Sequence, residues 1–443
     1  MLGWPHARLF VRHHAGGAAL AFEAPIDQLY SAAEVNEWAW LTALAATTSL
    51  DVGLHAPGHP AVWDATSAAQ TLRAFVATDI AESYKTIGGG ARHAKARCRS
   101  ARGAGARAWP LADLPRVAAV SWKTLHDIPV ALVTGSNGKT TTVRLLAAMA
   151  RANGWHAGHS CTDGVFIDGA AIDSGDFSGP AGAREVLRQP SVDVAILETA
   201  RGGLLRRGLA VQHANLAVVT NVSDDHFGEY GIHDLDGLTE VKLTVARVLG
   251  DTGVLVLNAD DAMLVKHGGS RVSPLAWFAH DEAHPLLCVH RERGGSTCGV
   301  RGGHLHLFHL GDDHDLGNVA DMPLSFAGSA AYNVSNMSAA TLAAAALGIA
   351  PATIAAVLSR FGQAHADNPG RLQHWRLGQS QVFVDYAHNP EGLRGLLGVA
   401  TRTQNSGRLG LILGQAGNRE DADIRELAAV ASIIIFEPHL VDL

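Results

Sequence analysis

The segment Thr134-Gly-Ser-Asn-Gly-Lys-Thr-Thr141 has the residue types and spacing that most directly indicate chemistry. It follows an apolar run at 128–133, which predicts a buried strand, and it precedes a predicted helix that begins near Lys139. Such a turn directs backbone N–H groups and a helix N-terminus at one point, where a polyphosphate binds. Lys139 adds a charge for the β- and γ-phosphates, and the Thr140 hydroxyl can complete a Mg²⁺ shell. Val133 stands where the common phosphate loop has glycine, so this is a shorter form.

Two polar clusters follow other apolar runs. Glu198 ends the run 192–198, and the glycines after it allow close approach of a ligand, so its carboxylate can hold Mg²⁺ directly. Its alternative role is to cap the next helix. His226 closes the sequence Thr220-Asn-Val-Ser-Asp-Asp-His226, and an imidazole oriented by neighbouring carboxylates can be a second metal ligand. A purely structural histidine is the alternative.

The elements that position these groups alternate between strand and helix from about 111 to 362. Continuous apolar strands separated by helices predict a mainly parallel sheet covered on both faces. Ligands of such a sheet bind at the carboxyl ends of its strands, so we expect the three polar clusters to converge on one edge. The predicted strands are 128–134, 192–198, 215–220 and 253–257, and the predicted helices are 139–153, 238–249, 333–347 and 352–361.

Three domains are expected. Residues 1–110 form a small N-terminal α+β domain of unclear role, with helical spacing at 32–50. Its Gly-, Arg- and Lys-rich stretch at 88–107 is interpreted as a solvated loop, a nucleic-acid arm being the alternative. Residues 111–364 form the central P-loop domain, and 365–443 form a short doubly wound, Rossmann-like domain. The last domain has predicted strands at 381–386, 409–413 and 432–436, a helix from Pro390 and a helix at 421–431.

Composition narrows the class of protein. A chain of 443 residues with 47% hydrophobic and 17% charged residues has ample material for several cores. Its net charge of −7 argues against capture of nucleic acid or of an anionic membrane. The alanine-rich run 338–358 is interrupted by Gly348 and Pro351, which favours two helices over a membrane span. The four cysteines form no C-x-x-C pair and no secretory pattern is visible, so a cytoplasmic location is expected.

The order of motifs resembles the Mur ligase superfamily of ATP-dependent amide ligases, which includes the muramyl ligases and folylpolyglutamate synthetase. Within it, the chain is most similar to the ligase half of the cyanophycin synthetase branch. The likeness spans about 130 to 420. It is carried by the phosphate loop, Cys161-Thr-Asp-Gly164, Gly175-Asp-Phe-Ser-Gly-Pro180, Glu198-Thr-Ala-Arg-Gly-Gly-Leu-Leu-Arg206, Asn221-Val-Ser-Asp-Asp-His226, Asn333-Val-Ser-Asn336, Asn368-Pro-Gly-Arg371 and Asp385-Tyr-Ala-His-Asn-Pro390.

The resemblance implies ATP and Mg²⁺ and assigns a role to each matching residue. The phosphates would bind to Gly135, Ser136, Asn137, Gly138, Lys139, Thr140 and Thr141. Thr140, Glu198 and His226 would hold the metal, and Lys242 is the position of a carbamylated lysine in muramyl ligases, an ordinary helix lysine being the alternative. Asn336 would contact adenine, Arg371 the phosphates, Asp385 the ribose or the domain boundary, and His388 would lie near the nucleotide.

The implied activity is that of an ADP-forming acid–amino-acid ligase. An amide forms from a carboxylate only after activation, and transfer of the γ-phosphate gives an acyl phosphate that an amine attacks. The metal ions and Lys139 would offset the developing charge, and closure of two domains would exclude water. Arginine and an aspartate side chain of a peptide-like acceptor are the first substrates to try. The identity of both substrates, and whether the protein self-associates or needs a partner subunit, are left open.

Two departures from the family pattern keep alternatives open. Cyanophycin synthetases carry an ATP-grasp region upstream, for which residues 1–110 have no room. The C-terminal domain is short, and Gly414-Gln-Ala-Gly-Asn-Arg419 matches the family's Gly/Asp/Arg-rich loop only loosely. A catalytically incomplete, nucleotide-binding partner subunit is therefore one alternative, and a P-loop phosphoryl transferase is another.

Overall fold

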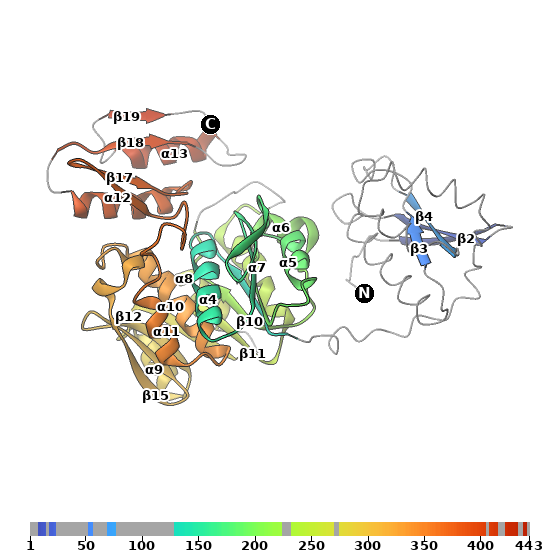
Figure 1. The fold of residues 1–443 in the computed structure, drawn as a ribbon, viewed down its shortest axis with the longest axis horizontal. Helices are drawn as coiled ribbons and strands as arrows, with labels where there is room; N and C mark the ends of the chain where they lie inside the picture. The colour runs from blue at the N-terminus through green and yellow to red at the C-terminus, as the bar shows by residue number, and fades with distance from the viewer. Residues whose placement is uncertain are drawn as a thin grey trace. The chain divides into compact units, whose positions relative to one another are not determined.

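The computed structural model separates the chain into two units, Met1–Ser121 and Trp122–Leu443. It describes four strands of the first unit, and residues 128–443 except 224–231, 270–273, 405–406, 415–420, 433–436 and 441–443. The four strands form an antiparallel sheet in the order β1-β2-β4-β3. They are β1 (Arg8–His14), β2 (Gly17–Glu23), β3 (Val52–His55) and β4 (Ala69–Val76) (Figure 1). The helix predicted at 32–50 lies outside the described residues.

An 11-stranded sheet is the centre of the second unit, in the order β15-β14-β13-β12-β11-β10-β5-β9-β6-β7-β8. The strands from β13 to β6 in this order are parallel, as predicted, and an antiparallel extension flanks each side. The strands are β5 (Val130–Thr134), β6 (Ala157–Cys161), β7 (Gly164–Ile167), β8 (Ala170–Ser174), β9 (Val194–Glu198), β10 (Ala214–Val219), β11 (Leu249–Asn258), β12 (Leu275–Asp281), β13 (Ser296–Arg301), β14 (His304–His309) and β15 (Asp312–Asn318).

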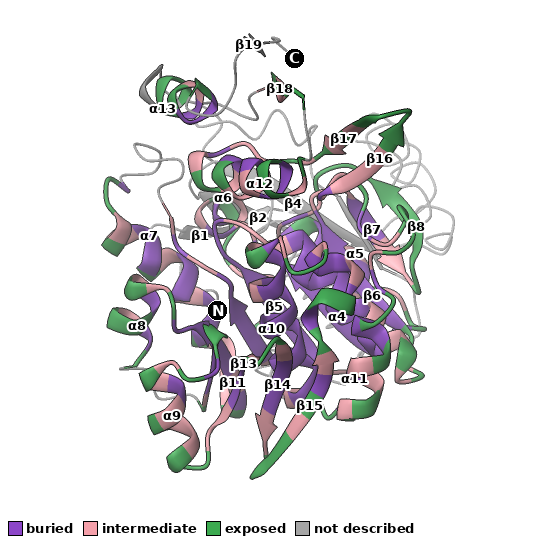
Figure 2. Cartoon of the chain, turned by 90° about the vertical axis from the view of Figure 1, so that its left-hand side faces the viewer, coloured by how far each residue is buried: buried purple, intermediate pink, exposed green. Residues whose placement is uncertain are grey.

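Helices cover both faces of this sheet, because alternate residues of its buried strands point to opposite sides. Ala131 and Val133 of β5 pack in one core with α4, α10 and α11, while Val130 and Leu132 pack in the other with α5, α7, α8 and α9 (Figure 2). The helices are α4 (Lys139–Ala152), α5 (Pro180–Leu187), α6 (Arg201–Arg207), α7 (Leu235–Lys242), α8 (Ala262–Gly268), α9 (Pro285–Glu292), α10 (Ala331–Ala346) and α11 (Pro351–Leu358).

Helical turns of the 3₁₀ type replace part of one predicted helix. The pattern at 238–249 predicts a single helix, whereas α7 ends at Lys242 and is followed by the 3₁₀ segment η7 (Leu243–Val248). Two more such turns, η8 (Val319–Asp321) and η9 (Pro323–Ser325), precede α10. Of the helices in the described part of the chain, none is long and apolar enough to cross a membrane.

The C-terminal segment is α/β, as predicted, but its strand pairing differs from a simple doubly wound unit. β16 (Gln373–Leu377), which the sequence did not predict, pairs antiparallel with β17 (Ser380–Val384). β18 (Gly410–Leu413) pairs parallel with β19 (Glu437–Leu440). Of the strand expected at 432–436, Ser432 belongs to α13 and residues 433–436 lie outside the described residues. Leucines of α12 (Pro390–Thr403) and α13 (Asp421–Ser432) pack with Leu413 in a small core.

Candidate active site

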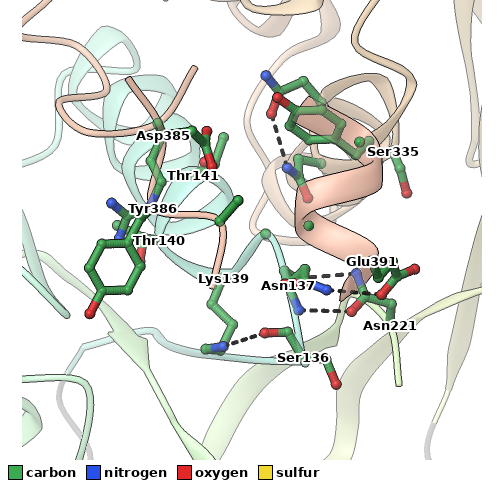
Figure 3. A pocket seen from close by; sticks show the side chains of 18 of the residues that line it. Ser136, Asn137, Lys139, Thr140, Thr141, Asn221, Ser335, Asp385, Tyr386 and Glu391 are labelled. Carbon is green, nitrogen blue, oxygen red and sulfur yellow. Dashed lines mark hydrogen bonds between the residues drawn. The ribbon is translucent and has the colours of Figure 1, made fainter. Parts of the chain in front are cut away.

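A cavity of about 240 Å³ lies at the carboxyl ends of β5, β9 and β10 and is also lined by residues of α10, the linker after α11 and the start of α12 (Figure 3). The three polar clusters predicted to converge on one edge of the sheet lie along this cavity where the structure describes them, with the phosphate loop, Glu198 and Asn221 all in its lining. The rest of the third cluster lies in residues 224–231, outside the described residues. The predicted site residues that line the cavity are Ser136, Asn137, Gly138, Lys139, Thr140, Thr141, Glu198, Asn336, Arg371, Asp385 and His388.

The phosphate loop has the geometry of a cradle that only glycine permits. Gly135 and Gly138 have φ values of 150° and 82°. A Cβ atom on Gly135 would lie 1.9 Å from Thr220 Oγ1, and one on Gly138 would lie 2.0 Å from Asn336 Oδ1. α4 begins directly after Gly138 without a side-chain cap, so the N–H groups of its first turn remain for a ligand.

Contacts with the segment after β10 hold the loop in place. The Ser136 N–H donates to the Asn221 carbonyl oxygen at 3.0 Å, and the Asn137 N–H donates to Asn221 Oδ1 at 2.9 Å. The hydroxyl of Thr220 in turn donates to the Asn137 carbonyl oxygen at 2.6 Å. Lys139 folds back, its ammonium donating to the carbonyl oxygens of Gly135 at 3.0 Å and Ser136 at 2.8 Å. The cation therefore stands beside the open helix N-terminus, where it adds to the attraction of an anion.

Glu198 is a buried carboxylate at the end of β9, with 1% of its surface exposed. It accepts hydrogen bonds from the Thr140 hydroxyl at 2.8 Å and the Thr162 hydroxyl at 3.1 Å. Within the described part of the chain it forms no ion pair, and a buried charge is costly unless it is paired or binds a metal. A carboxylate beside a threonine hydroxyl is the oxygen donor set that Mg²⁺ prefers, so this pair fits a divalent cation next to the phosphate cradle.

Arginines join the loop helix to the linker that leads into the C-terminal segment. Arg144 of α4 pairs with Asp163 at 2.6 Å and donates to Asn368 Oδ1 at 3.2 Å. Arg371 donates to Thr140 Oγ1 at 3.4 Å, and its guanidinium lies 4.6 Å from the centre of the Tyr386 ring. Arg371 is thus held where its charge faces the same Thr140 that contacts Glu198.

The far end of the cavity contains buried polar groups. Asp385 accepts from the Leu372 N–H at 2.6 Å, and burial raises the pKa of its carboxyl group. Burial and the nearby Asp385 charge raise the pKa of Tyr332 well above its ordinary value, and the described residues provide no hydrogen-bond partner for its buried hydroxyl. Asn336 donates to Asn333 Oδ1 at 3.2 Å, which leaves its own oxygen against Gly138. The polar groups at this end of the cavity can hydrogen-bond a ligand, and none of Asp385, Tyr332 and Asn336 carries a positive charge.

Some predicted site residues lie elsewhere. Lys242 is buried at the end of α7 and, like Gly135, is not among the residues that line the cavity. His226 is outside the described residues. The sequence reasoning assigned no role to Thr162, Tyr332, Asn389 and Glu391, although all but Asn389 line the cavity. Asn389 and Glu391 flank Pro390, and an Asn-Pro pair at a helix start is a capping signal that could have directed attention to them.

Two family models match this region. The Mur ligase middle domain matches residues 133–344, and the Mur ligase, glutamate ligase domain matches residues 370–438, which together exceed half of the chain. The chain belongs to the Mur ligase superfamily. Both the resemblance drawn from the motifs and the α/β fold class are thereby confirmed.

Curated relatives point to two branches of the superfamily. The chain is 36% identical over 307 residues to the cyanophycin synthetase of Nostoc sp., a match that covers 69% of this chain and 34% of that protein. It is 32% identical over 313 residues to the UDP-N-acetylmuramoyl-L-alanyl-D-glutamate–2,6-diaminopimelate ligase of Xanthomonas campestris, covering 68% of this chain and 59% of the relative. The chain thus spans about a third of the length of the cyanophycin synthetases it matches.

Among solved structures, the fold is similar to a bifunctional folylpolyglutamate synthase/dihydrofolate synthase with Mn, AMPPNP and L-glutamate bound. The TM-score is 0.50 at 20% sequence identity, and the match covers 70% of this chain and 74% of that one. At this identity the likeness establishes the fold.

Proposed function

We propose that this protein is an ATP-dependent, ADP-forming ligase of the cyanophycin synthetase type that joins the amine of an amino acid to a carboxyl group of a peptide-like acceptor. The observation that carries the proposal is the buried Glu198 carboxylate bonded to Thr140 at the edge of an open phosphate cradle, within a Mur ligase domain. The cradle fits a polyphosphate, and the carboxylate–hydroxyl pair fits the cation that accompanies it.

Each residue has a proposed role in this reaction. The first turn of α4 and Lys139 hold the phosphates, and Thr140, Glu198 and His226 hold Mg²⁺, with Lys242 supporting the metal from α7. Asn336, Asp385 and His388 bind the base and sugar, and Arg371 reaches the phosphates. ATP and Mg²⁺ supply the activation of the acceptor carboxylate as an acyl phosphate.

The protein's own residues then protect and orient the activated carboxylate. Lys139 and Arg371 offset negative charge that develops on the transferred phosphoryl group, and this is worth most in a site from which water is excluded. The start of α12 and the Arg371 linker line the cavity, and their closure over it in the reaction would exclude the water that hydrolyses an acyl phosphate. A reducing cytoplasm suits the free thiols of Cys161, Cys288 and Cys298.

The test is release of phosphate from ATP, measured with a panel of amino acids and acidic peptide acceptors, together with mass spectrometry of the product. We expect release that requires both an amine and a carboxylate acceptor, and a product that is larger by one amino acid. Glu198→Ala should abolish it, whereas Glu426→Gln, which alters an exposed acid of α13, should not.

Two other results would replace the proposal. Nucleotide binding without turnover under every substrate combination would indicate a partner subunit that is inactive alone. A stable phosphorylated product without an amide would indicate a phosphoryl transferase.

A further inference from the structure

Asn389 is a buried side chain whose orientation is determined by the helix that it caps. With 2% of its surface exposed, it stands directly before Pro390, and its Oδ1 accepts from the Gly392 N–H at 2.8 Å. The oxygen of the carboxamide is therefore committed to α12. Its NH₂ group must point the other way, and it donates to Asn137 Oδ1 at 2.9 Å.

This contact in turn orients the side chain of Asn137 in the phosphate loop. Because its oxygen accepts from Asn389, its own NH₂ group faces the first turn of α12 and donates to Glu391 Oε2 at 2.9 Å (Figure 3). The bond to a carboxylate is charge-assisted and stronger than one between neutral groups. One carboxamide thus makes two complementary bonds to the start of α12.

The backbone of Asn137 is held from the opposite side. Its N–H donates to Asn221 Oδ1, and its carbonyl oxygen accepts from Thr220 at 2.6 Å. Its neighbour Ser136 makes reciprocal bonds with Ser223, donating to the carbonyl oxygen at 3.1 Å and accepting from the N–H at 3.0 Å. Asn137 therefore stands between the segment after β10, which continues toward His226, and the helix that closes the cavity.

α12 forms one wall of the cavity, so its position decides whether the cavity is closed. Glu391, Gly392 and Gly395 line it, and a Cβ atom on Gly395 would lie 3.0 Å from the ring of Tyr332 in α10. Beyond this close packing, the far end of α12 is tied to the central domain by Arg402, which donates to the Ser329 carbonyl oxygen at 2.9 Å. The start of the helix depends on Asn137.

We propose that the Asn137 carboxamide is a positioning residue that docks the start of α12 onto the phosphate loop, through paired bonds to Asn389 and Glu391. Docking completes the water-excluding wall while the nucleotide is held by other groups, the helix N-terminus and Lys139. Loss of docking therefore lowers amine-dependent turnover more than nucleotide affinity and lets water compete with the amine. The inference rests on the proposed function for its kinetic readout.

A reciprocal exchange tests the pairing. Asn137→Asp keeps an acceptor for Asn389 but places a carboxylate against Glu391, so docking should fail. Adding Glu391→Gln supplies an NH₂ donor to that carboxylate and re-forms both bonds. Adding Glu391→Ala instead removes the like charge without supplying a donor. Comparing the two double variants therefore distinguishes the effect of the hydrogen bond from the effect of the charge. Glu292→Gln, which alters an exposed acid at the end of α9, is the matched control for removal of an acid.

Three quantities are measured for each variant: amine-dependent and amine-independent phosphate release, affinity for AMPPNP, and hydrogen exchange of the peptide spanning α12. For Asn137→Asp we expect amine-dependent turnover to fall about 10- to 100-fold, the loss of one hydrogen bond to a charged group. The amine-independent fraction should rise and the first turn of α12 should exchange faster. Asn137→Asp/Glu391→Gln should return to within about fivefold of the parent, and Asn137→Asp/Glu391→Ala should not.

Equal recovery in both double variants would overturn the pairing and leave only a charge effect. Recovery in neither, with unchanged exchange of α12 in Asn137→Asp, would overturn docking altogether. A parent protein that releases no amine-dependent phosphate refutes the proposed function instead. In that case hydrogen exchange across the same variants still decides the docking, so the two failures are distinguishable.

Discussion

Gly138→Ala is the change that most directly tests the phosphate cradle. The residue has φ of 82°, where an alanine costs about 1–2 kcal/mol relative to glycine. In addition, the new Cβ would lie 2.0 Å from Asn336 Oδ1, whereas ordinary contact starts at 3.4 Å, so one of the two must move by roughly 1.4 Å. Asn336 cannot move easily, because its side chain is hydrogen-bonded to Asn333, which itself donates to the Leu324 carbonyl oxygen at 3.0 Å. We therefore expect the loop to move.

The displaced loop takes the first N–H groups of α4 away from the phosphates. Losing one or two hydrogen bonds to a charged ligand costs about 3 kcal/mol, which weakens AMPPNP binding about 100-fold. The matched control is Gly348→Ala, because Gly348 has φ of 87° but no atom lies within 4 Å of the position that a Cβ would take there. Both variants should lose stability in thermal unfolding, Gly138→Ala the more because of its clash with Asn336, while only Gly138→Ala should lose affinity in calorimetry. Affinity of Gly138→Ala within about threefold of Gly348→Ala would refute the cradle.

Three further outcomes are expected. Lys139→Ala should lower turnover on the order of 10³-fold, with a smaller effect on AMPPNP affinity, because the charge matters most in the transition state. Tyr332→Phe should raise the midpoint of thermal unfolding, because the hydroxyl that it removes is buried without a hydrogen-bond partner among the described residues. Asp385→Asn should raise the unfolding midpoint at pH 7. Burial raises the folded-state pKa of Asp385, so its contribution to stability is present below its unfolded pKa and is lost as pH rises through the folded value, and the gain should vanish in acid.

Part of the parallel centre of the sheet could be predicted, because several of its strands are short apolar runs followed by a turn signal, whereas β6, β12 and β13 were not predicted. β5, β9, β10 and the end of β11 all coincide with predicted strands to within a few residues. The antiparallel extensions were missed for a different reason. β14 reads His-Leu-His-Leu-Phe-His between glycine-containing turns. This alternation of residue types is typical of a hairpin strand, and histidines in place of more obviously polar residues obscured it.

Residues that follow strands directly could be assigned to the site from the sequence, because parallel strands share one carboxyl edge. Lys139, Thr140 and Glu198 meet this condition, and they line one cavity. Thr162 also follows a parallel strand, β6, but that strand was not predicted. Tyr332 reaches the cavity by the packing of α10, which no spacing in the chain specifies. Lys242 was assigned to the site on other grounds than its place after a strand. It was placed by resemblance on a helix after the His226 motif, and the structure buries it at the end of α7, off the cavity lining.

The site is divided between two parts of the chain, and this division explains why the phosphate loop alone says so little about the reaction. Residues of the central domain provide the cradle and the buried Glu198, which would serve any nucleotide-dependent transfer. What a ligase needs in addition is a means to admit an amine while excluding water, and that requires a wall that can be withdrawn. The wall here is the start of α12, joined to the loop through Asn137, together with the linker, whose Arg371 donates to Thr140 of α4. In the proposed mechanism Asn137 joins the phosphate loop to this wall, so closure is controlled beside the groups proposed to hold the phosphates, the helix N-terminus and Lys139.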